Sequence, residues 1–184
     1  MLGEEVDVSD RELSDWYRER ANLLVEALAN APDDLECATF MPAPTPRAFW
    51  ARRQAHEASI HRADVESAAG RTALFEADHA RDGVDELLTR FVVRPRKHPR
   101  TAFDPPRTML VRATEGGIWH VTLAAESITT VEEDRAGDVT IVGPASDLYL
   151  LLWNRMRAGD ADSGLMVDGD SAVLDLWHDN VAVR

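Results

Sequence analysis

The stretch HEASIHR, residues 56–62, brings histidine and glutamate side chains together at a spacing that could bind a metal ion. It has one residue more than the zinc-protease motif H-E-x-x-H, so the role of each side chain must be worked out separately. On an α-helix each residue turns by about 100°, which puts His56 and His61 on different faces. Glu57 and His61 are four residues apart and share a face. A carboxylate and an imidazole suit a divalent ion such as zinc, so the spacing predicts Glu57 and His61 as metal ligands.

Two ligands do not complete the site, because a catalytic zinc ion uses three protein ligands and keeps one position open. Asp64 lies seven residues after Glu57 on the same stripe of the helix, although it could instead pair with Arg53. Other candidate ligands lie outside this helix: His79, Asp82, His98, His120 and His178. The Glu57–His61 pair is also compatible with a simple surface or packing role.

The elements that must position this pair can be read from their start and stop signals. Thr45 is suited to cap a helix, Pro46 to begin it and Gly70 to end it, which predicts one long helix over about 46–69. A capping-box spacing at Ser9 and Glu12, followed by apolar residues at helical intervals, predicts an earlier helix over about 10–30. A third helix is expected over about 76–92, with a core stripe of Val84, Leu87, Leu88 and Phe91.

The pattern changes after the third predicted helix. Prolines and a basic cluster interrupt residues 94–106, and beyond them the apolar period becomes two. Residues 108–124 read as a β-hairpin that turns at 115–117, and further strands and two short helices are expected after it. The sequence therefore predicts an α+β fold with a helical region over 1–93, a linker over 94–106 and a small α+β domain over 107–184.

Composition narrows the possible partners. The chain has 33 acidic and 20 basic residues and a formal net charge of −13, so it repels phosphate backbones and we expect no nucleic-acid partner. It has no run of about 18–20 apolar residues, so no membrane span is expected. Its acidic N-terminus does not resemble a signal peptide. The single Cys37, expected to be buried, fits a reducing cytoplasm.

The string WARRQAHEASIHR, Trp50 to Arg62, resembles the mycothiol-dependent maleylpyruvate isomerase family, whose first domain is a DinB-like four-helix bundle. The stretch DWYRERANLLVEAL is similar to the third helix of that bundle. The stretches VTIVGPASDLYLLLWNR and LMVDGDSAVLDLWH are similar to the family's second domain, which has a sterol-carrier-protein-like fold. The resemblance runs from about Arg11 to Arg184.

This resemblance implies a zinc enzyme that uses mycothiol. In the family one zinc ion is held by a His from the second bundle helix and by a Glu-x-x-x-His pair from the fourth, which Glu57 and His61 match. The zinc is thought to activate the mycothiol thiol, which adds to a cis double bond. Rotation and elimination then release the trans isomer, and related enzymes are thiol transferases. We expect Arg53 and Arg62 to bind carboxylates of the thiol cofactor or of a small-molecule substrate.

One departure from the family pattern leaves alternatives open. The chain begins at what would be the third bundle helix and no His precedes His56, so the first zinc ligand has no counterpart. The chain is then expected to be a fragment of a longer protein, a homodimer that completes the bundle, or a catalytically degenerate, metal-free module for binding or dimerisation. In the second domain, Trp119, Trp153 and Trp177 are expected in the core, or around an apolar pocket.

Overall fold

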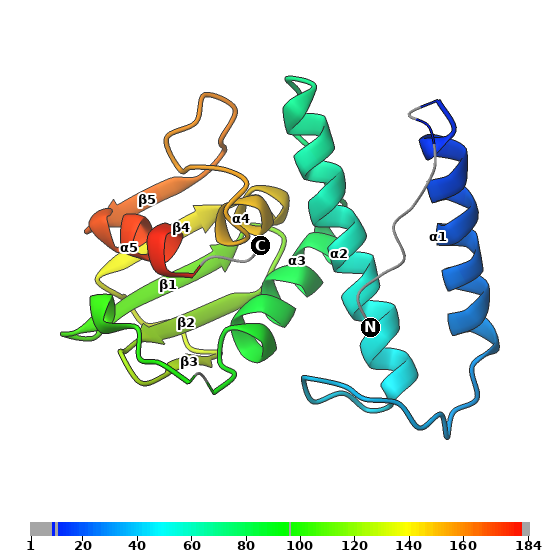
Figure 1. The fold of residues 1–184 in the computed structure, drawn as a ribbon. Coiled ribbons are helices and arrows are strands. Elements are labelled where there is room, and N and C mark those ends of the chain that lie inside the picture. Colours follow the sequence, from blue (N-terminus) through cyan, green and yellow to red (C-terminus); the bar gives the residue numbers. More distant parts are fainter. Residues whose placement is uncertain (1–8, 10, 96, 182–184) are drawn as a thin grey trace. The chain divides into compact units, whose positions relative to one another are not determined.

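The computed structural model describes Ser9 and residues 11–95 and 97–181. It divides into two compact units, Met1–Gln54 and Ala55–Arg184, and helix α2 (Pro46–Ala68) runs from the first unit into the second. Helices come first along the chain and a mixed sheet with further helices follows (Figure 1), which confirms the predicted α+β fold. The predicted domain boundary at 94–106 is not tested by this division and stays a prediction.

The first unit consists of α1 (Leu13–Asn30), a loop and the first turns of α2. The predicted capping box forms only in part: the Ser9 hydroxyl donates to the Glu12 carboxylate at 2.5 Å rather than accepting from the helix backbone. No described residue of α1 is buried. Its exposed apolar side chains are Leu13, Tyr17, Leu23, Leu24 and Val25. In the loop Cys37 is exposed, so the expectation that it is buried was wrong.

Helix α2 has the capped ends that the sequence predicts. At its start, the Thr45 hydroxyl accepts a hydrogen bond from the Ala48 N–H at 3.1 Å, and Pro46 is the first helical residue. At its end, Gly70 adopts a φ of +70° and donates to the Ser67 carbonyl, while the Arg71 N–H donates to Glu66, both at 2.9 Å. These two bonds form a Schellman motif, which needs a left-handed residue at the Gly70 position. Both ends of the helix that carries Glu57 and His61 are therefore specified locally.

The third predicted helix is regular only in its first part. Helix α3 (Ala77–Glu86) continues into a π-helical turn, η1 (Leu87–Phe91), in which the Val92 N–H donates to the Leu87 carbonyl. Val84, Leu87 and Leu88 are fully buried, so the predicted core stripe is confirmed there. The segment expected to be a linker contains a short 3₁₀ helix, η2 (Thr101–Phe103), whose phenylalanine is also fully buried.

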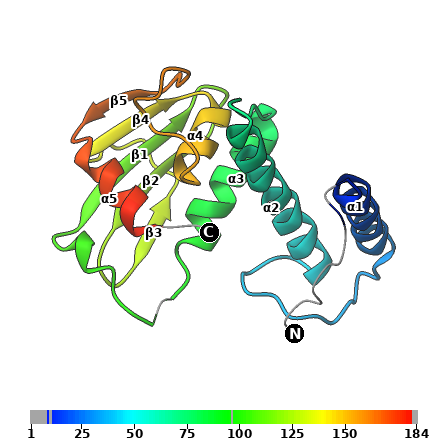
Figure 2. The same ribbon diagram turned by 45° about the horizontal axis from the view of Figure 1, so that its top comes forward.

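A five-stranded sheet follows, with strand order β3-β2-β1-β4-β5 (Figure 2). The predicted hairpin is confirmed, since β1 and β2 pair antiparallel with Val111 opposite Trp119. Strands β1 and β4 are parallel and the remaining pairs are antiparallel. The strands are β1 (Arg107–Ala113), β2 (Ile118–Leu123), β3 (Ile128–Val131), β4 (Val139–Gly143) and β5 (Met166–Gly169).

Two further helices, α4 (Ala145–Leu152) and α5 (Ala172–Asn180), contact the central strand β1. Trp153 and Trp177 are buried, as expected for core residues, and each indole N–H donates to a backbone carbonyl. Helix α3 packs on α4 within the same unit, which places the middle of α2, α3 and α4 against a common core. Among the helices that the structure describes, none is both long enough and apolar enough to span a membrane.

Candidate functional site

The predicted ligands Glu57 and His61 lie on one face of α2 and His56 lies on another, as the helical spacing requires. His61 Nε2 lies 3.6 Å from a carboxylate oxygen of Glu57, and both side chains reach the surface, with 63% and 43% of their areas exposed. His56 points elsewhere and is only 1% exposed. The prediction that Glu57 and His61 share a face without His56 is therefore confirmed as geometry, while metal binding by the pair stays a prediction.

A carboxylate fixes the orientation of the His61 ring. Its Nδ1 lies 3.0 Å from Asp64 Oδ2, and an ionised carboxylate can only accept, so Nδ1 carries the hydrogen in this contact. In the neutral ring this leaves the lone pair of Nε2 on the side of Glu57. Histidines that bind metals characteristically donate their second N–H to a carboxylate in this manner.

Arg155, which the sequence did not single out, holds Asp64 in place. Its Nε donates to Asp64 Oδ1 at 2.9 Å and its Nη2 to Oδ2 at 3.2 Å. The pairing of Asp64 with Arg53 that the sequence left open is thus replaced by pairing with Arg155. The hydrogen bonds from Arg155 lower the pKa of the Asp64 carboxyl below its usual value, which keeps it ionised beside His61.

The Glu57–His61 pair fits a divalent ion in spacing but not in ligand number. A tetrahedral zinc ion with bonds of about 2.0–2.2 Å separates its ligand atoms by roughly 3.3–3.6 Å, which the two facing atoms nearly match. Within residues 11–95 and 97–181, however, no three or more His, Cys, Asp or Glu side chains are grouped so that they could hold a metal ion. None of the additional ligands considered from the sequence, Asp64 and His79 among them, completes the site.

The two arginines predicted to bind the cofactor lie in different surroundings. Arg62 donates from Nη2 to the Leu74 carbonyl at 2.7 Å, and its guanidinium carbon lies 4.5 Å from the centre of the Phe75 ring. These contacts tie α2 to the loop before α3. Arg53 is 1% exposed. Binding of a cofactor by either arginine stays a prediction.

The buried face of α2 carries a polar network that the sequence did not predict. His56 contacts the Asp82 carboxylate through Nε2 at 2.8 Å and the Tyr149 hydroxyl through Nδ1 at 3.1 Å. The His79 ring lies 4.7 Å from the His56 ring, and its Nε2 is 2.8 Å from the Ser59 hydroxyl. The network joins α2, α3 and α4. An Asp carboxylate bonded to an imidazole orients the ring, so this network stabilises the scaffold behind the surface pair.

His79 should make the stability of this scaffold depend on pH. Burial lowers the pKa of His79 below its ordinary value, and the neighbouring His56 adds to the effect. The unfolded chain therefore takes up a proton near pH 6.5 that the folded chain takes up only at lower pH, so the free energy of unfolding falls as the pH drops below about 6.5. Replacing His79 by Gln should reduce this loss, measured by urea unfolding at about pH 7.5 and about pH 5.5. The exposed His98→Gln serves as the control, and an equal effect of both variants would contradict the prediction.

Comparisons with known proteins bear on both parts of the chain. A model described as the mycothiol maleylpyruvate isomerase N-terminal domain matches residues 4–66, and a model described as the MDMPI C-terminal domain matches residues 78–176. The first match contains Glu57 and His61, and the second contains Asp82, Tyr149 and Arg155. Among proteins with curated functions, none matches the chain.

Two solved structures resemble parts of the chain. One, described as a UbiJ-SCP2 ubiquinone synthesis protein, is 13% identical, with a TM-score of 0.35 over 67% of this chain and 91% of that one. The other is a conserved hypothetical protein, possibly a sterol carrier protein, from Thermus thermophilus. It is 17% identical, with a TM-score of 0.30 over 46% of this chain and 77% of that one. The match to the family's C-terminal domain alone spans more than half of the sequence, and with the N-terminal match it establishes that the chain belongs to the mycothiol maleylpyruvate isomerase family.

Proposed function

We propose that the chain is a mycothiol-dependent isomerase or thiol transferase that acts on a small molecule with a divalent metal ion, zinc by preference, held by Glu57 and His61. The observation that carries this proposal is the orientation of His61, with Nδ1 bound to Asp64 and Nε2 facing Glu57. Membership of the family supports mycothiol as the thiol. The lone Cys37 is consistent with a reducing, cytoplasmic setting.

Each residue around the pair has a distinct part in this proposal. A bound zinc ion would supply a lowered thiol pKa, so that the thiol is a thiolate nucleophile at neutral pH. Glu57 and His61 would hold the ion, and Asp64 would keep the His61 ring in its binding orientation. Arg155 would keep Asp64 ionised and aligned through its two hydrogen bonds. Arg53 and Arg62 would bind carboxylates of substrate or thiol.

A second copy of the chain would pack its helices against those of the first and so form a four-helix bundle. The exposed apolar side chains of α1, including Tyr17 and Val25, are the kind of surface that a partner helix covers. A homodimer would also give a route to a further metal ligand, which the described residues of one copy do not provide. That same shortage of ligands favours the rival proposal, a metal-free binding or dimerisation module of the same family.

The two proposals differ in metal and thiol binding by the whole chain. We expect the purified protein, dialysed against zinc, to retain about one equivalent per site and to bind mycothiol at least about tenfold more tightly with the metal than without it. Elemental analysis and titration calorimetry measure these quantities. Less than about 0.1 equivalent of zinc, together with a metal-independent thiol affinity, would favour the metal-free module. Analytical ultracentrifugation measures the oligomeric state. A stable monomer that binds a full equivalent of zinc would rule out the proposed dimer.

A further inference from the structure

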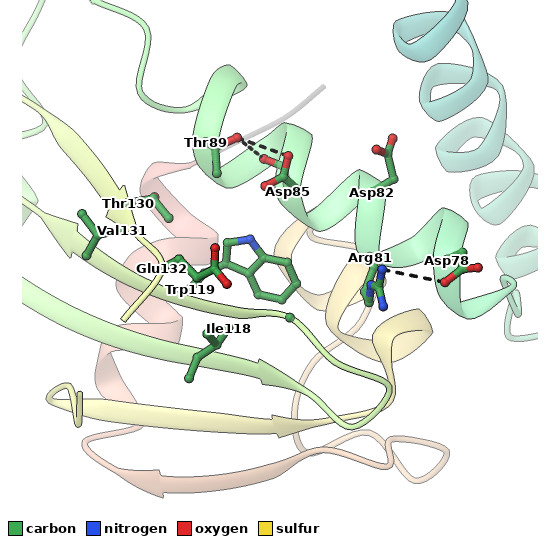
Figure 3. Close-up of a pocket in the computed structure, with 11 residues that line it drawn as sticks. Asp78, Arg81, Asp82, Asp85, Thr89, Ile118, Trp119, Thr130, Val131 and Glu132 are labelled. Atoms are coloured by element: carbon green, nitrogen blue, oxygen red, sulfur yellow. Dashed lines mark hydrogen bonds and ion pairs between the residues drawn. The ribbon is translucent and has the colours of Figure 1, made fainter. Parts of the chain in front are cut away.

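A cavity of about 540 Å³ lies between α3 with its π-helical turn and strands β2 and β3 (Figure 3). All of its walls belong to the unit Ala55–Arg184. Its volume is within the range of small-molecule sites in proteins, about 300–1,000 Å³. It is lined by neither Glu57 nor His61, so it is separate from the proposed metal pair.

The charge of this cavity favours a cation. Four carboxylates line it, and Arg81 is the one basic side chain among its lining residues. The acidic side chains are Asp78, Asp82, Asp85 and Glu132. They are not grouped closely enough to hold a metal ion, as noted for the described residues as a whole. Carboxylates spread over a cavity of this size match an organic cation, and the net charge of −13 would raise the local concentration of such a ligand.

Trp119 adds a hydrogen-bond donor, its indole N–H, to the wall of the cavity. The side chain lines the cavity but is only 7% exposed, and its indole N–H has no hydrogen-bond partner within the described part of the chain. In Figure 3 the indole nitrogen lies on the ring edge that points toward α3, across the cavity. The ring is packed closely on Gly117, where an added Cβ would lie 2.5 Å from it, so it cannot easily turn away. Solvent still reaches the indole nitrogen, where a ligand oxygen can take the place of water as the acceptor.

Asp82 is held in place from behind. Its carboxylate accepts from the buried His56 at 2.8 Å, and about half of its side chain remains exposed. The Thr89 hydroxyl also lies 3.4 Å from the Asp85 carboxylate, a longer contact than its 2.7 Å hydrogen bond to the Asp85 backbone carbonyl. Preorganised acceptors of this kind lose little conformational entropy when a ligand binds.

We propose that this cavity is a binding site for a hydroxylated organic amine, such as an amino sugar. The ammonium group pairs with Asp85 and Glu132, and a hydroxyl oxygen accepts from the Trp119 indole. This site does not depend on the proposed metal chemistry, since no residue is shared.

Three matched probes test the chemistry in titration calorimetry of the full chain at physiological salt, which suppresses loose ionic binding. Glucosamine, with both an ammonium group and hydroxyls, should bind with a Kd of about 1 mM or tighter. Glucose lacks the charge and putrescine lacks the hydroxyls, so each should bind at least about tenfold more weakly. Equal binding of glucosamine and glucose, or no binding of glucosamine at about 10 mM, would overturn the proposal.

Variants locate the binding in the cavity. Glu132→Gln, at an exposed position, and Trp119→Phe should each weaken glucosamine binding by about threefold to tenfold, because each removes one polar contact. Glu126→Gln is the matched control, since it removes an exposed carboxylate of the same unit outside the cavity lining. If Glu126→Gln weakened binding as much as Glu132→Gln, the effect would be one of overall charge and the proposed site would be wrong. Thermal unfolding checks that Trp119→Phe is folded. If this variant does not fold, the comparison of Glu132→Gln with Glu126→Gln tests by itself whether glucosamine binds in the cavity.

Discussion

Replacing His61 by Ala is expected to lower the affinity of the chain for zinc by at least about 100-fold, because partners of a ligand alone are worth about 10–100-fold. The change removes Nε2, one of the two atoms that face each other across 3.6 Å, and leaves Glu57 as a single carboxylate on the surface. Competition with a chromogenic chelator at neutral pH measures the affinity. The prediction follows from the proposed function and tests its central residue.

Two comparisons make the result specific. His98→Ala removes an exposed histidine from the loop after η1 and should leave zinc affinity unchanged. Asp64→Asn keeps the shape of the carboxylate but weakens its hold on His61, so it should give an intermediate loss of about 10–100-fold. Zinc binding by His61→Ala that equals that of the wild type would show that the metal, if bound, is held elsewhere.

Gly83→Ala is expected to lower the free energy of unfolding by about 3 kcal/mol, at the upper end of the usual cost of overpacking. An added Cβ would lie 2.2 Å from Cε2 of the buried Tyr149 ring and 2.9 Å from Nδ1 of His56. Alanine is the better helix former by about 1 kcal/mol, so the steric cost must exceed this gain before any loss is seen. Urea unfolding monitored by circular dichroism measures the difference.

Gly159→Ala is the matched control for this substitution. An added Cβ there meets nothing within 4 Å, and we expect a change within about 0.5 kcal/mol. If Gly83→Ala were as stable as Gly159→Ala, Tyr149 and His56 could move apart easily and the buried network would not be rigid. Loss of the network should also change zinc binding less than the loss of His61 does, because His56 lies on the other face of α2.

The helix with the surface pair could be predicted from sequence because all of its signals are local. Thr45, Pro46 and Gly70 define its ends, and a spacing of four residues is enough to place Glu57 beside His61. The hairpin of β1 and β2 was predictable for the same reason, since a glycine-rich turn joins two strands of period two. In each case neighbours in sequence are also neighbours in space.

The rest of the site could not be predicted because its contacts join distant parts of the chain. Arg155 lies 91 residues after Asp64, and Tyr149 lies 93 residues after His56. Both follow from the packing of α4 against α2 and α3, which a single sequence does not determine. One signal was present: Gly83 is an isolated glycine inside α3, and such a glycine often marks the close approach of another group.

The π-helical turn at Leu87–Phe91 also bears on how this family can vary. A π turn contains one residue more than the α-helical path it replaces, and here the Leu88 carbonyl accepts from the Thr130 hydroxyl of β3 at 2.7 Å. Deleting a single residue from the turn would restore a regular helix over the same path, so the residues after it would keep their places. Relatives with and without the extra residue would therefore keep both the Asp82–His56 contact on α3 and the packing of the chain after the turn, so alignments of this family should place a one-residue gap at 87–91 rather than within α3.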